Sequence, residues 1–263
     1  MIGVRWNRRA AYHCGMMRDR VRFEVADASR GDGADDDFDP VAGELQVRIF
    51  CVLAGSVDEV ELTARGAGLG MGPFDLLLPE IRLVATREAR SVPVARCICG
   101  TYGCAMTDAV IVRDGDAVRW DWEHEAPIDR PLVFDAAQYD AEVARIGTDR
   151  SWERREDTAA RRVLELVDHE RLAASGMRIE FSGPPWDRPE RYGVCLRLVE
   201  SGDRQYQVFV SVPWSGDPER SASDVRELLA EPPAGWEAGY SAVTMNGPAR
   251  PQAAGTAWIQ GGF

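Results

Sequence analysis

The sequence predicts an α+β fold, in which a β-rich N-terminal part precedes a smaller α+β part with an antiparallel sheet and flanking helices. Short segments in which apolar and polar residues alternate dominate residues 20–133, as expected of half-buried strands. From Phe134 onward, apolar residues recur at helical spacing, and further strand-like segments follow. A chain of 263 residues is long enough for two domains. We therefore expect a β-rich domain at 17–133 and an α+β domain at 134–247.

Both ends of the chain are expected to lie outside these domains. Residues 1–16 carry basic side chains but no continuous apolar core, so they do not form a secretory signal peptide. They are predicted to be disordered, or to result from a start site placed too far upstream. Residues 248–263 are rich in Gly, Ala and Pro, which predicts a flexible tail.

The strands of the first domain follow from β-branched and apolar runs between turn residues. They are expected at residues 20–26, 45–53, 57–63, 109–113 and 116–122, with the last two joined at Asp114-Gly115, a favoured two-residue turn. The glycine-rich residues 66–72 are expected to form a mobile loop. Their spacing does not complete a dinucleotide-binding motif, and Pro73 and Phe74 suggest an extended continuation rather than a helix.

The second domain begins with helical signals. Asp135 can cap a helix that carries Tyr139, Val143 and Ile146 on one face and ends at Gly147. The remaining elements are expected as a helix at 157–174, strands at 177–181, 192–200 and 205–213, and a short helix at 221–230 capped by Ser221 or Ser223.

Composition excludes several classes of function. The formal net charge is −12, which argues against binding to a nucleic-acid backbone. No apolar run approaches the roughly 20 residues of a membrane-spanning helix. The chain contains no lysine, which excludes Schiff-base, pyridoxal-phosphate, Walker-A and kinase chemistry that depends on one. Six cysteines without a signal peptide favour a reducing compartment, so a cytoplasmic location is expected.

The clearest chemical signal is a cluster of cysteines followed by a hairpin. Cys97, Cys99 and Cys104 lie in a short, glycine-bent segment, and the hairpin returns His124 to the neighbourhood of these thiols. A slip of one residue in strand register decides which face His124 occupies. Three cysteines and one histidine form a legitimate structural zinc set, so these four residues are the predicted zinc ligands, with Cys51 as a less favoured fourth. Alternatively, the segment is a turn with inert thiols, or a redox or disulfide element.

Two acidic patterns suggest weaker sites. Asp35, Asp37 and Asp39 resemble the start of a calcium loop, but the required glycine and final glutamate are missing, so a solvated acidic loop is expected. In residues 120–125, carboxylates alternate with Trp120, Trp122 and His124. A strand with one apolar face and one solvated face explains this pattern. A pair of carboxylates for acid–base catalysis is the alternative interpretation.

The cysteine segment, Val118-x-Trp120, and Phe134-Asp135 with Gln138-Tyr139-x-x-Glu142 together resemble a group of uncharacterised bacterial proteins, mainly from high-GC actinobacteria. The resemblance covers residues 40–145 well. Ala105 departs from the Gly or Trp expected after the last cysteine. Because this group has no established activity, the resemblance supports the architecture and implies no function.

These observations favour a non-catalytic cytoplasmic protein that binds another protein or acts as an accessory factor, for example an immunity-type partner of a bacterial toxin. The acidic charge predicts a basic protein partner. One alternative is a zinc-stabilised module with a regulatory or small-ligand-binding role. A second is an enzyme that depends on the thiols or carboxylates and acts on an unknown substrate.

Overall fold

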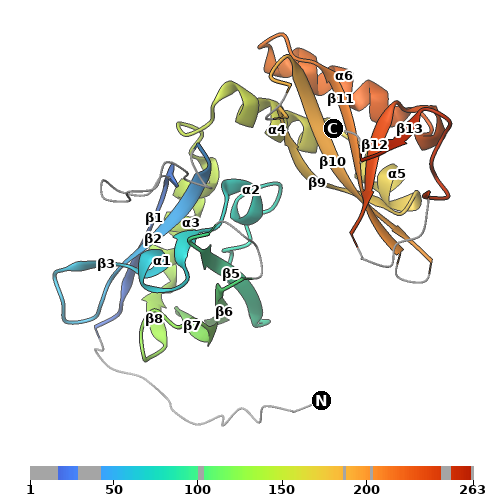
Figure 1. The fold of residues 1–263 in the computed structure, drawn as a ribbon. Helices are drawn as coiled ribbons and strands as arrows, with labels where there is room; N and C mark the ends of the chain where they lie inside the picture. Colours follow the sequence, from blue (N-terminus) through green and yellow to red (C-terminus); the bar gives the residue numbers. More distant parts are fainter. Residues whose placement is uncertain are drawn as a thin grey trace. The chain divides into compact units, whose positions relative to one another are not determined.

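A computed structural model describes residues 17–28, 43–99, 104–185, 188–201, 204–243 and 250–261. The predicted α+β class is confirmed, with antiparallel sheets and several helices in the described residues (Figure 1). The predictions for residues 1–16 and for the calcium-like Asp35, Asp37 and Asp39 fall outside the described residues.

The chain divides into two compact units, Met1–Asp149 and Arg150–Phe263, whereas the sequence placed the boundary between residues 133 and 134. Strand β8 (Leu132–Asp135) pairs with β7 (Ala117–His124). Helix α3 (Ala136–Thr148) packs against β1 (Arg20–Asp27). Because β8 and α3 both pack against strands of the first unit, the boundary lies after them.

The first unit contains two antiparallel sheets. One has the order β1–β2–β3, and the other has the order β4–β5–β6–β7–β8. The other elements of this unit are β2 (Leu45–Val52), β3 (Glu59–Glu61), α1 (Leu62–Arg65), β4 (Gly68–Gly70), α2 (Pro73–Leu76), β5 (Arg90–Cys97) and β6 (Met106–Asp114). The links between the sheets include a parallel bridge between Asp19 and Phe134 and a hydrogen bond from the Val47 N–H to the Met71 carbonyl.

An aromatic cluster forms the centre of the first unit. Phe23, Trp120, Phe134 and Tyr139 are fully buried, and their ring centroids lie 5.6–6.4 Å apart. Asp135 accepts hydrogen bonds from two N–H groups in the first turn of α3, as the sequence predicts for an N-cap. The cap starts the helix at a position from which Tyr139 points into the cluster. Burial of each aromatic ring stabilises the fold by about 1.5–3 kcal/mol.

Several predictions for the first unit were wrong. The glycine-rich residues 66–72 do not form a loop, because Gly68–Gly70 pairs with β5 as strand β4. The expected extended run at Pro73 is helix α2. Strand β5 was not predicted, since Pro93 interrupts its alternation and causes a shift in register against β6. The hairpin turn is Gly115-Asp116 rather than Asp114-Gly115, because Asp114 pairs with Ala117.

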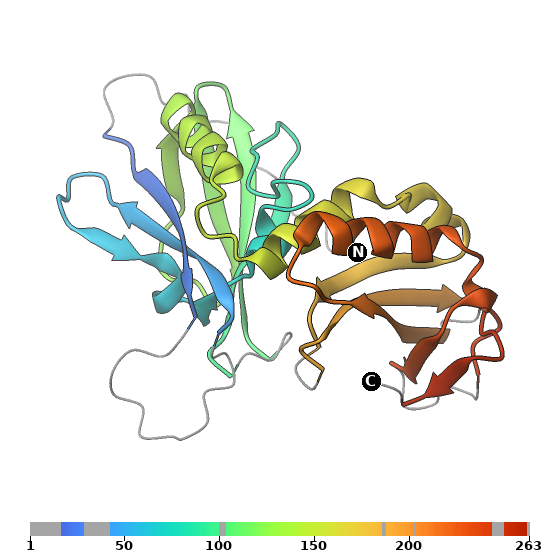
Figure 2. The same cartoon turned by 90° about the horizontal axis from the view of Figure 1, so that it is seen from above.

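The second unit is a five-stranded sheet with helices on one face (Figure 2). The sheet order is β13–β12–β11–β10–β9, and every pair is antiparallel except β12 with β13. Its elements are α4 (Arg155–Leu166), α5 (His169–Ala174), β9 (Met177–Gly183), β10 (Arg191–Glu200), β11 (Arg204–Pro213), α6 (Pro218–Ala230), the 3₁₀ turn η1 (Pro233–Gly235), β12 (Ala238–Ala242) and β13 (Trp258–Gln260). None of the helices in the described residues is long and apolar enough to cross a membrane.

The strands predicted at 177–181, 192–200 and 205–213 are confirmed, but three details of the second unit differ. The helix expected at 157–174 is broken into α4 and α5, because Asp168 caps a new helix. Helix α6 starts earlier than expected and is capped by Asp217, not by Ser221 or Ser223. In the tail, Trp258 is buried and begins strand β13, so this part of residues 248–263 belongs to the sheet.

Candidate metal centre

The candidate site lies at the end of the hairpin formed by β5 and β6. Cys97 is the last residue of β5, where it pairs with Gly68 of β4. Its N–H donates a hydrogen bond of 2.9 Å to the carbonyl of Ala105, just before β6 begins. Cys97 is thus held by the strands on both sides, and the hairpin returns Cys104 to it.

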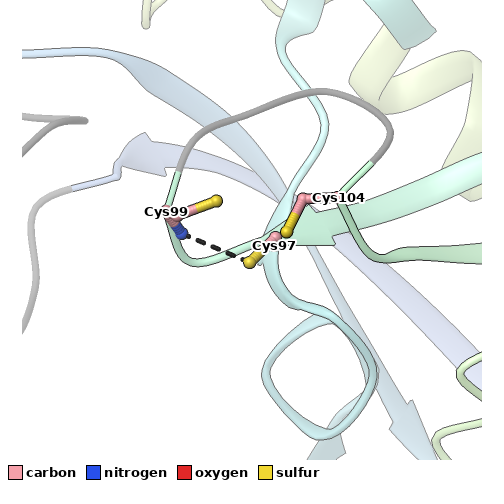
Figure 3. Close-up of side chains that lie close together, drawn as sticks. All are labelled: Cys97, Cys99 and Cys104. Atoms are coloured by element: carbon pink, nitrogen blue, oxygen red, sulfur yellow. Dashed lines mark hydrogen bonds between the residues drawn. The ribbon is translucent and has the colours of Figure 1, made fainter.

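The three cysteines converge at this hairpin end (Figure 3). All three Sγ atoms lie within 4.8 Å of one another, which is close enough for one metal ion to collect them. The N–H of Cys99 also donates a hydrogen bond of 3.5 Å to the Sγ of Cys97. Cys97 is half-buried and Cys104 is exposed. The group therefore has one side against the protein and another open to solvent.

Buried polar contacts hold the strands behind the thiols. The buried side chain of Arg96, which precedes Cys97, forms an ion pair with Glu44. The hydroxyl of Thr107 accepts a hydrogen bond from the Ala67 N–H at 2.8 Å and donates one to the Glu125 carbonyl at 3.0 Å. Thr107 therefore ties the segment before β4 to the end of β7.

Gly68 also supports the site through its conformation. Its φ of +112° lies in the region that favours glycine, and a Cβ at this position would clash with the side chain of Ile98. Ile98 stands between Cys97 and Cys99 in the sequence. The glycine thus lets β4 approach the cysteine segment closely.

The pKa shifts of the thiols do not favour a nucleophile. Hydrogen bonds with Cys97 and then with Cys99 raise the pKa of Cys104 to about 11. Burial raises the pKa of Cys51 and of Cys195 to about 12. A reactive cysteine needs a lowered pKa, because the thiolate is the nucleophile. Each of these three shifts is in the opposite direction.

His124 does not join the three thiols. The hairpin has a β-bulge between Asp108 and Ala109, so that Ala109 pairs with Trp122 and Asp108 pairs with His124. The Nδ1 atom of His124 lies 2.8 Å from Oδ2 of Asp108, and its side chain is 68% exposed. The predicted fourth ligand is therefore placed beside a carboxylate, outside the sulfur cluster.

The other residues predicted as metal ligands or catalytic carboxylates also lie outside the thiol group. Cys51 is buried on β2 and is not a member of the thiol group. On β7, Asp121 accepts hydrogen bonds from Arg119, and Glu123 accepts one of 2.6 Å from the hydroxyl of Ser91. Across the described residues, the three cysteines form the one group of three or more His, Cys, Asp or Glu side chains whose donor atoms lie this close together.

Two residues that support the site, Gly68 and Thr107, were not predicted from the sequence. Gly68 could have been found, since closely spaced glycines often mark a tight approach of two chain segments. Nothing in the sequence distinguishes Thr107 from other strand threonines. Comparison of the chain with protein-family models, with curated proteins and with solved structures gives no significant match. The resemblance to the actinobacterial group therefore stays a prediction.

Proposed function

We propose that the first unit contains a zinc-binding element, in which Cys97, Cys99 and Cys104 are the protein ligands and the metal stabilises the hairpin. The observation that carries this proposal is the convergence of three Sγ atoms within 4.8 Å. Thiolates are soft ligands, which select zinc or monovalent copper over calcium and magnesium. The metal has a structural, non-catalytic role in this proposal.

The spacing of the sulfurs suits a zinc ion after a small contraction. A Zn–S bond of about 2.3 Å in a tetrahedral site places two sulfurs about 3.8 Å apart. The thiols therefore need to move together by about 1 Å or less on binding. Such a movement is feasible because Cys104 is exposed, while hydrogen bonds and strand pairing hold Cys97 in place.

The raised pKa of Cys104 also supports a structural role over thiol catalysis. Hydrogen bonds with Cys97 and then with Cys99 favour the protonated form of this thiol and raise its pKa to about 11. A zinc ion displaces such protons, since the thiolate is the form that binds metal.

Alkylation mapping tests this proposal. Zinc should protect all three cysteines from iodoacetamide, and a chelator should remove the protection. A Cys99→Ser substitution should also expose Cys97 and Cys104 in the presence of zinc, because two thiolates hold the metal weakly. A Cys195→Ser substitution in the second unit is the matched control and should leave the protection unchanged. Equal alkylation rates with and without zinc would reject the zinc element.

A second candidate function is the binding of a basic protein partner, as an accessory or immunity-type factor. The net charge of −12 favours this candidate, since complementary charge speeds and selects association. The test is size-exclusion chromatography after mild lysis at low and at high salt. A defined basic protein that co-elutes at low salt and dissociates at high salt would support it, and a free chain under both conditions would count against it.

A further inference from the structure

Among the residues that the structure describes, three ligand side chains meet at the thiol group, and its exposed side leaves room for a further ligand. Its members come from one hairpin end, and Cys104 faces solvent there. The two sequence candidates for a fourth ligand are placed elsewhere: His124 lies against Asp108, and Cys51 is buried on β2. A zinc or cobalt ion held by three protein ligands keeps its fourth position for water or another molecule.

From this geometry we infer that the fourth coordination position of the metal faces solvent and takes a thiolate from another molecule. The inference rests on the proposed metal site. Sulfur is the expected incoming donor, because a metal that is already bound by soft thiolates favours another soft ligand. The source is either a small thiol or a cysteine of a second protein chain, and both supply the same chemistry.

The exchange needs no oxidant. The incoming thiol gives its proton to solvent, and its sulfur forms a bond to the metal as the bound water leaves. The metal and all four sulfurs keep their oxidation states. Cys104 is exposed and Cys97 is half-buried, so the incoming sulfur enters on the side of Cys104.

Cobalt(II) reports this step directly, since each thiolate on a tetrahedral cobalt adds to the charge-transfer absorption. The full chain is loaded with one equivalent of cobalt under anaerobic conditions and titrated with glutathione. The absorption per cobalt should rise in the ratio of four thiolates to three and then saturate. His124→Ala should behave like the wild-type chain, because His124 is hydrogen-bonded to Asp108 and is not a ligand.

The possible results separate the two proposals. A chain that does not bind cobalt at all overturns both the metal site and the inference. Two results overturn the inference alone. One is cobalt that is bound by three thiolates and whose absorption does not change with glutathione. The other is a four-thiolate spectrum of the monomeric chain before any thiol is added. Native mass spectrometry of the same sample identifies the source. One chain with one metal and one glutathione supports a small thiol, and two chains that share one metal support a protein thiol.

Discussion

His124 and Asp108 face each other across the β6–β7 pair, with Nδ1 of the histidine 2.8 Å from Oδ2 of the carboxylate. This pairing determines the composition of the candidate metal site. It holds the imidazole away from Cys97, Cys99 and Cys104, so within the described part of the chain the site is a group of three thiols with an open side. Zinc binding should therefore depend on the cysteines and should not depend on His124.

Zinc should stabilise the folded chain measurably. A ligand that binds only the folded state at one hundred times its Kd raises the free energy of unfolding by about 2.7 kcal/mol. Denaturant unfolding followed by fluorescence, with zinc and with a chelator, measures this difference. Cys97→Ser should remove it, because the substitution leaves two of the three proposed thiolate ligands. Superimposable curves for the wild-type chain would show that no metal binds.

Asp19 should contribute to stability in a manner that depends on pH. The carboxylate is buried, and it accepts hydrogen bonds from Arg130 and from the N–H groups of Ala54 and Val133. Burial raises the pKa of Asp19, but Arg130 and the two N–H groups together lower it by more, so that it lies below its ordinary value of 3.8. Its contribution is therefore complete above about pH 4 and is lost as the pH falls through the folded-state pKa.

Asp19→Asn should reduce the free energy of unfolding at pH 7 by about 1–3 kcal/mol, because Arg130 and two buried N–H groups lose their charged acceptor. The difference from wild type should shrink as the pH falls below 4. Asp58→Asn, at an exposed position, is the matched control and should change stability little at any pH. An Asp19 variant with the same deficit at pH 7 and at pH 2 would disprove the ionic contribution.

The hydroxyl of Tyr139 should also be needed for full stability. It donates a hydrogen bond of 2.7 Å to the Leu83 carbonyl and accepts one of 3.3 Å from Nε1 of Trp120. Tyr139→Phe keeps the ring but leaves both buried partners unsatisfied, which should cost about 1–3 kcal/mol. Thermal and chemical unfolding measure the loss. A variant as stable as the wild type would mean that water or another group replaces the hydroxyl.

Gly70 should not tolerate a side chain. A Cβ at this position would clash with the Val47 carbonyl, which is backbone and cannot move aside cheaply. Gly70→Ala should therefore destabilise the first unit by about 1–3 kcal/mol or more, as overpacking does. Gly235→Ala is the control, because its Cβ would meet no atom closer than 3.8 Å. Equal stability of the two variants would contradict the close approach of β2 and β4.

Local sequence patterns predicted those parts of the fold that local interactions determine. The N-cap at Asp135 and the long strands of the second unit follow from capping and alternation, and both are present. Strand β4 was missed because its glycines have little strand propensity and pair through close backbone approach. The domain boundary was placed too early because the packing of α3 against β1 is a long-range contact.

For the candidate site, too, the sequence predicted the part that depends on neighbouring residues and not the part that depends on strand register. Proximity in sequence was enough to bring Cys97, Cys99 and Cys104 together. The position of His124 depended on register, and the β-bulge after Asp108 shifts the pairing by one residue. No pattern of residue types in the hairpin signals that bulge. The fourth ligand therefore could not be assigned from the sequence.

Native mass spectrometry of the purified chain, with the Cys99→Ser and His124→Ala variants beside it, tests the central claim most directly. The three-thiol site predicts one zinc ion per chain in the wild type, one in His124→Ala and none in Cys99→Ser. Absence of zinc from the wild type after loading would contradict the metal centre. Loss of zinc from His124→Ala would show instead that the histidine is a ligand.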